Sequence, residues 1–224
     1  AISDAGAASV DVTSLTDVNG TSVSLGGGTF NSGTLTFNSA GAVIVAEDSP
    51  MAVVGTNTGG AVQLSNTPNN STSITSINGS LTVTSLEITG AGTLSLAGSV
   101  TSTSGLTIDE TVTLTGATTV TTQGTSNLTF AGTIDGPQTL ALNSGGITTL
   151  QGEIGNTTAL TSITTDASGT TAINGGTVTT TGDQTYGDAV TLGAATTLIG
   201  NDITLASTVN GAQTLNVQSS GGGT

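Results

Sequence analysis

The chain has 224 residues and contains no Lys, Arg, His or Cys, so its 14 Asp and Glu residues give a formal net charge of −14. A chain without cationic side chains cannot neutralise phosphates, which argues against nucleic acids and anionic membrane surfaces as partners. The lack of His and Cys removes imidazole and thiolate metal sites, and also disulfides. The length allows one or two domains with a sizeable core.

The composition favours β-strands over helices. The sequence holds 50 Thr, 25 Ser and 34 Gly, and Val and Ile add to the β-branched residues. Such side chains fit a pleated sheet better than a helix, and good helix formers are scarce. No run of 18 apolar residues occurs, so we expect no transmembrane helix.

In chain order, the sequence alternates short apolar-polar runs with turn signals. The runs are residues 34–37, 42–46, 81–89, 93–96, 112–115, 128–130, 139–142, 190–192 and 203–205. Turns are indicated at Asn19-Gly20, Asn78-Gly79, Asp135-Gly136, Asn174-Gly175 and Asn210-Gly211. Asn-Gly and Asp-Gly pairs tolerate positive φ, so the pattern predicts strands of three to nine residues joined by tight turns.

Internal repeats give the strongest signal. Residues 129–146 match residues 204–221 with nine of 18 identical, at an offset of 75, and residues 100–120 match residues 178–198 at an offset of 78. A shorter period of 19 relates residues 82–84 to 101–103 and residues 128–130 to 147–149. Four such periods equal one long repeat. Short strands that recur with a period of about 20 residues are typical of a β-solenoid, whose coils bury apolar side chains by stacking.

We therefore predict a parallel β-solenoid with coils of about 19 residues, giving roughly 12 coils and a rod of about 55 Å at the spacing of parallel strands. Residues 1–80 would form less regular coils and residues 81–224 regular ones, in one continuous rod that is a segment of a longer chain. The alternative is an antiparallel sandwich. It fits less well, since the chain has three Phe, one Tyr and no Trp to fill such a core.

Residues 169–198 (GTTAINGGTVTTTGDQTYGDAVTLGAATTL) and 210–221 (NGAQTLNVQSSG) resemble the repeats of large bacterial exoproteins of the filamentous-haemagglutinin and autotransporter type. The resemblance covers roughly residues 81–224. It implies a right-handed parallel β-helix, an extracellular or cell-surface location, and a role as adhesin stalk or fibre. The Asn-Pro-Asn-Gly-like motif of that family's secretion domain is missing; the nearest approach is Thr67-Pro68-Asn69-Asn70.

Candidate sites are few. Asp183 and Asp188, which flank Tyr186 in an expected loop, are the best pair of carboxylates for a glycosidase. The preferred interpretation is that they are solvated turn residues, so we expect no catalytic, cofactor or metal site and no enzyme activity. Neither a calcium-binding glycine-rich nonapeptide nor an EF-hand loop occurs, which leaves weak, nonspecific calcium binding by the acidic surface.

Three functions stay open. The first is a structural segment of a bacterial adhesin-like stalk, whose binding target lies elsewhere in the full protein. The second is a self-assembling extracellular filament whose copies join head to tail. The third is ice binding by stacked Thr-x-Thr arrays, for which the pairs Thr82/Thr84, Thr101/Thr103 and Thr119/Thr121 are candidates.

Overall fold

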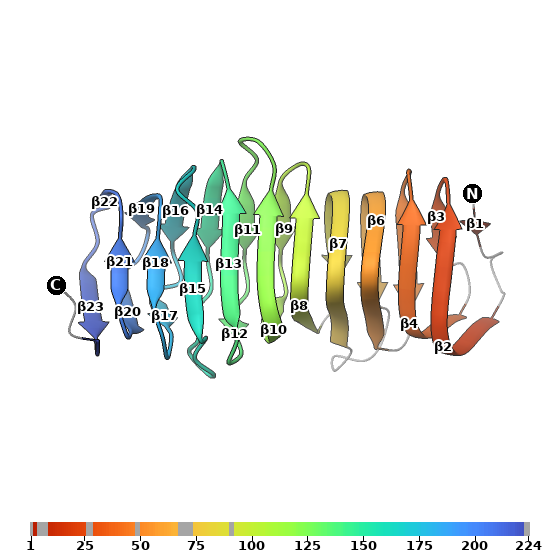
Figure 1. Ribbon diagram of the computed structural model, residues 1–224, viewed down its shortest axis with the longest axis horizontal. Coiled ribbons are helices and arrows are strands. Elements are labelled where there is room, and N and C mark those ends of the chain that lie inside the picture. Colours follow the sequence, from red (N-terminus) through yellow and green to blue (C-terminus); the bar gives the residue numbers. More distant parts are fainter. Residues whose placement is uncertain are drawn as a thin grey trace.

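The computed structural model describes residues 2–3, 9–25, 29–47, 50–66, 74–89 and 92–221. The chain forms an all-β parallel solenoid with about 20 residues per turn, which confirms the predicted fold class. Coils stack along the long axis from the N-terminal strands to the C-terminal ones (Figure 1). The right-handed sense of winding stays a prediction. No helix with the length and apolar character of a membrane span occurs in the described part of the chain.

Each coil contributes to three parallel sheets, which we call sheets 1, 2 and 3 in chain order. In the first coils, long strands continue from sheet 1 onto sheet 2: β2 (Ser9–Gly20), β4 (Thr29–Ser39), β6 (Met51–Asn66), β7 (Ile74–Thr89), β8 (Thr93–Ser102) and β10 (Thr111–Thr122). Later coils use separate strands for these two sheets. In sheet 1 they are β12 (Ile134–Asp135), β17 (Thr177–Thr179), β20 (Thr196–Gly200) and β23 (Leu215–Ser219). In sheet 2 they are β13 (Thr139–Ser144), β15 (Ser162–Thr165), β18 (Gln184–Tyr186) and β21 (Ile203–Leu205). Sheet 3 contains β1 (Ile2–Ser3), β3 (Val23–Leu25), β5 (Val43–Glu47), the ends of β6 and β7, β9 (Leu106–Ile108), β11 (Leu128–Phe130), β14 (Ile147–Leu150), β16 (Thr170–Ile173), β19 (Ala189–Leu192) and β22 (Val209–Asn210).

Several coils are longer than the short period of the sequence predicts. Thr82 does pair with Thr101, as that period requires. Met51, however, pairs with Thr75, and Thr139 pairs with Ser162, and both of these steps along the chain exceed the period. The predicted coil length of about 19 residues is therefore too short for these steps, and the average is about 20 residues per turn.

The core consists of columns of inward side chains, one from each coil. In sheet 1 the column Val112, Ile134, Ile154, Val178 and Leu198 is 0–1% exposed throughout. Each of these side chains packs on its counterparts in the coils before and after it. No coil could bury its apolar face alone, so the hydrophobic contribution to stability lies between coils rather than within them.

Many hydroxyl side chains lie inside the rod, next to the turns. Ser102, Thr122 and Ser144 stack in successive coils and are at most 4% exposed. Their Oγ atoms donate hydrogen bonds to turn carbonyls, Ser102 to Thr84 O at 3.0 Å and Thr122 and Ser144 to Ser126 O at 2.8 and 2.9 Å. A buried hydroxyl is tolerated when it is hydrogen-bonded, so the Ser and Thr content serves the interior as well as the surface.

Glycine is required where β6, β7 and β8 pass from sheet 1 to sheet 2. Gly55, Gly79 and Gly98 stack in register with φ of 71°, 145° and 107°. A Cβ on Gly79 would lie 2.1 Å from Gly55 O, and one on Gly98 would lie 2.1 Å from Gly79 O. At Gly79 and Gly98 the backbones thus approach too closely for any side chain, whereas at Gly55 the positive φ alone favours glycine.

The long repeat is not a whole number of turns. Val112 lies in sheet 1, whereas its repeat partner Val190 lies in sheet 3; Leu140 lies in sheet 2, whereas its partner Leu215 lies in sheet 1. From β10 to β19 the chain makes 11 steps from one sheet to the next, which is three and two-thirds turns. Equivalent sequences therefore build different faces of the rod, and the expectation that four short periods make one long repeat is wrong.

Candidate functional site

The two acidic residues singled out by the sequence do not share a site. Asp183 is exposed, and its Oδ1 accepts hydrogen bonds from Asn201 Nδ2 at 2.8 Å and from Asp202 N at 3.2 Å. Asp188 is 3% exposed and lies inside the rod. The carboxylates thus have different surroundings, one in a surface turn and one in the core. The expectation that both are solvated turn residues is right for Asp183 and wrong for Asp188.

Asp188 reaches into the corner between sheets 2 and 3. Its Oδ1 accepts hydrogen bonds from Thr165 Oγ1 of β15 at 3.0 Å and from Thr171 Oγ1 of β16 at 2.9 Å, and both threonines are buried. Burial raises the pKa of the Asp188 carboxyl, because the charged form loses solvation; the two threonine hydrogen bonds oppose this shift. Asp188 is therefore a buried acid held by neutral donors in a chain that has no cationic side chain.

A second polar group of the interior lies on β18, just before Asp188 in the chain. Gln184 is fully buried; its Nε2 donates to Val178 O at 3.1 Å and to Ile199 O at 2.8 Å. The hydroxyl of Tyr186, also fully buried, donates to Gln184 Oε1 at 3.0 Å, and burial raises the pKa of that phenol. Sequence reasoning placed Tyr186 in a loop and missed this network. Tyr186 continues the inward column of Leu142 and Thr165, so the alternation of inward and outward positions was the available signal.

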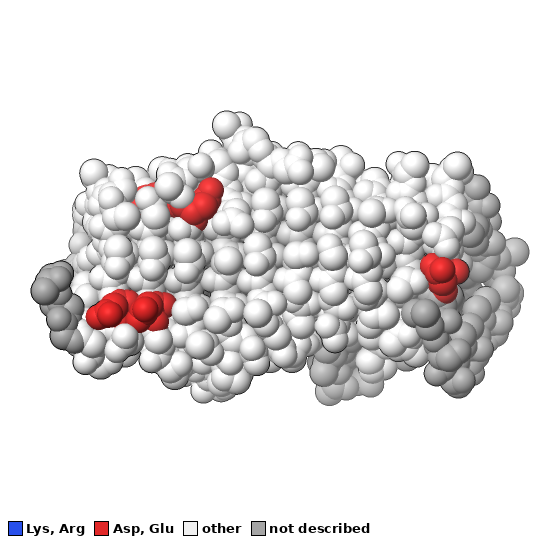
Figure 2. All heavy atoms as spheres, viewed as in Figure 1, with Lys and Arg blue, Asp and Glu red and all other residues white. Residues whose placement is uncertain are grey.

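The outer surface of sheet 2 carries two straight columns of small side chains, all of them polar except one alanine. The first column is Thr56, Ser80, Ser99, Thr119, Ala141, Thr164, Thr185 and Thr204; the second is Asn19, Asn38, Thr58, Thr82, Thr101, Thr121 and Asn143. In Figure 2 acidic side chains lie towards the margins of this view, and its middle is uncharged. The result is a regular hydroxyl and amide surface with no ionisable group in these two columns.

The register of these columns differs in part from the expected Thr pairs. Thr82 stacks on Thr101 as predicted, but Thr101 continues to Thr121, and Thr119 stacks on Ser99. The reason is a register shift in β10 between Leu114 and Thr118, which lengthens the step from β8. Thr103 lies beyond the end of β8 and is not part of either column.

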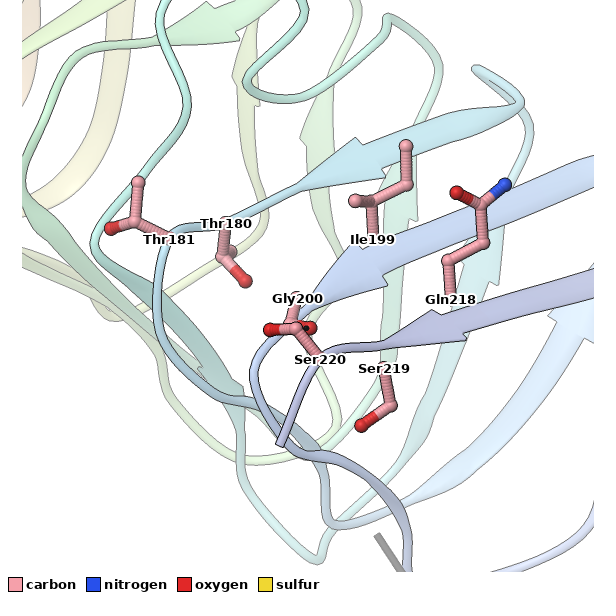
Figure 3. A pocket seen from close by; sticks show the side chains of 7 residues that line it. All are labelled: Thr180, Thr181, Ile199, Gly200, Gln218, Ser219 and Ser220. Atoms are coloured by element: carbon pink, nitrogen blue, oxygen red, sulfur yellow. Dashed lines mark hydrogen bonds between the residues drawn. The ribbon is translucent and has the colours of Figure 1, made fainter. Parts of the chain in front are cut away.

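The described surface includes two hollows of different size. The larger, of about 460 Å³, is lined by Thr180, Thr181, Ile199, Gly200, Gln218, Ser219 and Ser220, with Ile199 and Gln218 side by side on β20 and β23 (Figure 3). Its hydroxyls are committed to backbone carbonyls, as in the bonds from Thr180 Oγ1 to Gly182 O at 2.7 Å and from Ser220 Oγ to Gly200 O at 3.3 Å. The smaller, of about 210 Å³, lies on sheet 3 around Ile44 and Ala61. Neither hollow gathers the convergent, free polar groups of a ligand site.

Acidic side chains do not converge on a cation position in the part of the chain that the structure describes: no three of them are grouped so as to hold a metal ion. Glu110 stands apart, in the turn between β9 and β10. Burial raises the pKa of its carboxyl, and its Oε2 is buried without a hydrogen bond.

Comparison with known protein families, with curated proteins and with solved structures finds no match. The solenoid fold is thus established by the strand pairing alone, and the likeness to haemagglutinin-type and autotransporter repeats stays a resemblance. The tetrapeptide Thr67-Pro68-Asn69-Asn70, the nearest approach to that family's secretion motif, lies outside the described residues.

Proposed function

We propose that this chain is a structural rod, the stalk segment of an extracellular or cell-surface protein of the bacterial adhesin type. The observation that carries the proposal is the stack of parallel coils, in which strand pairing joins one coil to the next along the described part of the chain. Such a stack gives length and stiffness, because bending or stretching it loads backbone hydrogen bonds and packed side-chain columns along the whole rod. The scarcity of free polar groups in the hollows agrees with a mechanical role.

The rod is tested by small-angle scattering on a pair of chains, the 224-residue protein and a version with one or more complete coils duplicated. We expect a rod envelope that lengthens by about 4.8 Å per added coil at constant cross-section. A flexible or compact envelope would overturn the mechanical proposal. Location is tested separately, by labelling intact producing cells with antibodies raised against the chain. Labelling only after lysis would overturn a surface location while leaving the rod intact.

One observation favours ice binding as a second candidate. On four consecutive coils, sheet 2 presents Thr or Ser two residues before Thr: Thr56/Thr58, Ser80/Thr82, Ser99/Thr101 and Thr119/Thr121. This forms a flat grid of hydroxyls spaced about 4.8 Å between coils and about 6.6 Å along each strand. A rigid grid of this kind can match a crystalline surface. Ice binding would be established by thermal hysteresis that is lost in Thr101→Tyr but kept in Thr129→Tyr, a control on the outer side of sheet 3. The absence of hysteresis in the unaltered chain would exclude ice binding.

A further inference from the structure

An exposed loop interrupts the coil between β14 and β15, in the middle of the rod. Residues 154–162 pair at both ends with residues 134–139 of the coil before, so the longer segment has to bulge outward. The bulge is a loop at residues 155–159, which projects beyond the strand ends next to β15 (Figure 1). Its exposed side chains are those of Asn156, Thr157 and Thr158.

The backbone of this loop is held in place, while its side chains are free. Asp135 Oδ1, in the coil before, accepts hydrogen bonds from Thr157 N at 2.9 Å and from Thr158 N at 3.0 Å. Gly136 N donates to Thr158 O at 3.1 Å. Within the part of the chain that the structure describes, neither the amide group of Asn156 nor the hydroxyl of Thr158 makes a hydrogen bond. The loop therefore presents both side chains to solvent on a fixed backbone.

Asn156, Thr157 and Thr158 form an Asn-x-Thr sequence, and Asn-x-Ser/Thr in a surface loop is the acceptor sequence of N-linked glycosylation. The chain contains six sequences of this kind, which begin at Asn19, Asn69, Asn70, Asn78, Asn127 and Asn156. A match to so short a pattern is weak evidence in a chain rich in Ser and Thr, so the structural setting of each one decides. Asn69 and Asn70 lie outside the described residues.

The other three are tied into the sheets. Asn78 lies within β7 and is paired with strands on both sides. Asn127 Oδ1 accepts a hydrogen bond from Ile147 N at 2.9 Å, and the middle residue of its sequence, Leu128, is fully buried. Asn19 is the penultimate residue of β2, and its Nδ2 donates to a neighbouring carboxylate at 3.1 Å. A transferase has to bind all three residues of the acceptor sequence, and strand pairing or burial prevents this.

We propose that Asn156 is a site of N-linked glycosylation, modified in preference to the sheet-bound sequences. The second substrate is a sugar activated by a diphosphate carrier, and a glycosyltransferase of the producing cell joins the two. Asn156 Nδ2 attacks the anomeric carbon of the sugar, the bond from that carbon to the diphosphate oxygen breaks, and the carrier leaves with the bonding electrons. The amide nitrogen loses one proton to a base of the transferase. Because the loop lies outside the strands, the sugar leaves coil stacking intact, and this inference does not depend on the structural role proposed above.

Mass spectrometry of the chain isolated from its producing cells tests the proposal. A protease that cleaves after Asp and Glu releases residues 154–166, a peptide whose only acceptor sequence begins at Asn156. We expect this peptide to carry a sugar on the Asn156 side chain. A single hexose would identify a nucleotide sugar as the donor, whereas an oligosaccharide transferred as one block would identify a lipid-linked donor. A peptide that carries no sugar would overturn the proposal.

Variants made in the same cells test the role of each loop residue. Asn156→Gln and Thr158→Ala should lose the sugar, and Thr158→Ser should keep it because Ser also completes the acceptor sequence. Thr157→Ala is the matched control, since it removes an equally exposed hydroxyl of the same loop from the middle position, and it should keep the sugar. Loss of the sugar in Thr157→Ala, or its retention in Thr158→Ala, would contradict modification through the acceptor sequence.

Asn127 supplies the comparison within the same chain. The same protease releases residues 111–135, whose only acceptor sequence begins at Asn127. We expect this peptide to be free of sugar. Equal modification of Asn127 and Asn156 would overturn the inference that the exposed loop selects the site.

Discussion

Replacing Gly79 by Ala should destabilise the rod far more than a typical glycine substitution. Gly79 has a φ of 145°, a backbone conformation that glycine adopts readily, and the strain in an L-residue there costs about 1–2 kcal/mol. Its new Cβ would also lie 2.1 Å from Gly55 O in the coil below. Relieving that contact means moving the two backbones apart by about 1 Å, which breaks about two hydrogen bonds worth about 1 kcal/mol each. We therefore expect a loss of about 3–4 kcal/mol in the free energy of unfolding.

Two control variants separate the contributions. Gly124 has a φ of 63° with no atom within 4 Å of a new Cβ, so Gly124→Ala should cost only the backbone strain, about 1–2 kcal/mol. Gly145 has no positive φ, but its Cβ would lie 2.2 Å from Gly124 O, so Gly145→Ala should show the cost of crowding alone. Urea unfolding followed by far-ultraviolet circular dichroism measures the free energy of unfolding of all three variants. If Gly79→Ala costs no more than Gly124→Ala, close approach of the coils does not limit these positions.

Three further changes test the interior and the composition. Burial raises the pKa of Asp188 and Glu110, so the folded state binds the protons of these two carboxyls more tightly than the unfolded state does. Their contribution to the free energy of unfolding is therefore fully present below the unfolded pKa and is lost as the pH rises through the folded pKa. Urea unfolding at pH 3, 5 and 7 should therefore show a smaller decline in Asp188→Asn, and an unaltered decline would contradict the assignment. Tyr186→Phe should lower the free energy of unfolding by about 1–3 kcal/mol, since Gln184 Oε1 loses its buried donor; thermal unfolding with no change would show that water or another group replaces it. Trypsin should leave the denatured chain intact because it has no Lys or Arg, and fragments on a gel would contradict the sequence itself.

The sequence was sufficient to predict the fold class because coil stacking imposes simple rules. The alternation of apolar and polar residues along Leu128–Phe130 and Ile203–Leu205 predicted two strands that the structure contains. The register of strand pairing between coils was harder to predict than the strands themselves. Residues 128–130 were matched to residues 147–149, but Leu128 pairs with Thr148, one residue further on. A shift of one residue exchanges the inward and outward positions, and a sequence in which Thr occupies both sides cannot reveal it.

The interior polar groups were predictable only in part. Thr165 and Thr171 lie at inward positions of ordinary alternating runs, yet nothing in those runs shows that both face Asp188 from different sheets. Their meeting depends on the length of the turns between β15, β16 and β19, which fixes where one coil lies over the next. Local patterns determine the side of a strand that a residue occupies, whereas its neighbours across a corner depend on every turn before it.

The long repeat and the three-sheet coil together explain why equivalent residues acquire different roles. Glu110 and Asp188 occupy equivalent positions of the long repeat, and burial raises the pKa of both. Because the repeat spans 11 sheet positions, Glu110 lies at the corner before sheet 1 and Asp188 at the corner before sheet 3. Each repeat thus specifies an acid just before a strand, but the adjacent sheets decide its partners. Asp188 meets two threonine hydroxyls, while Glu110 Oε2 meets none, so the same sequence element yields a hydrogen-bonded buried acid at one corner and an acid with an unpaired oxygen at another.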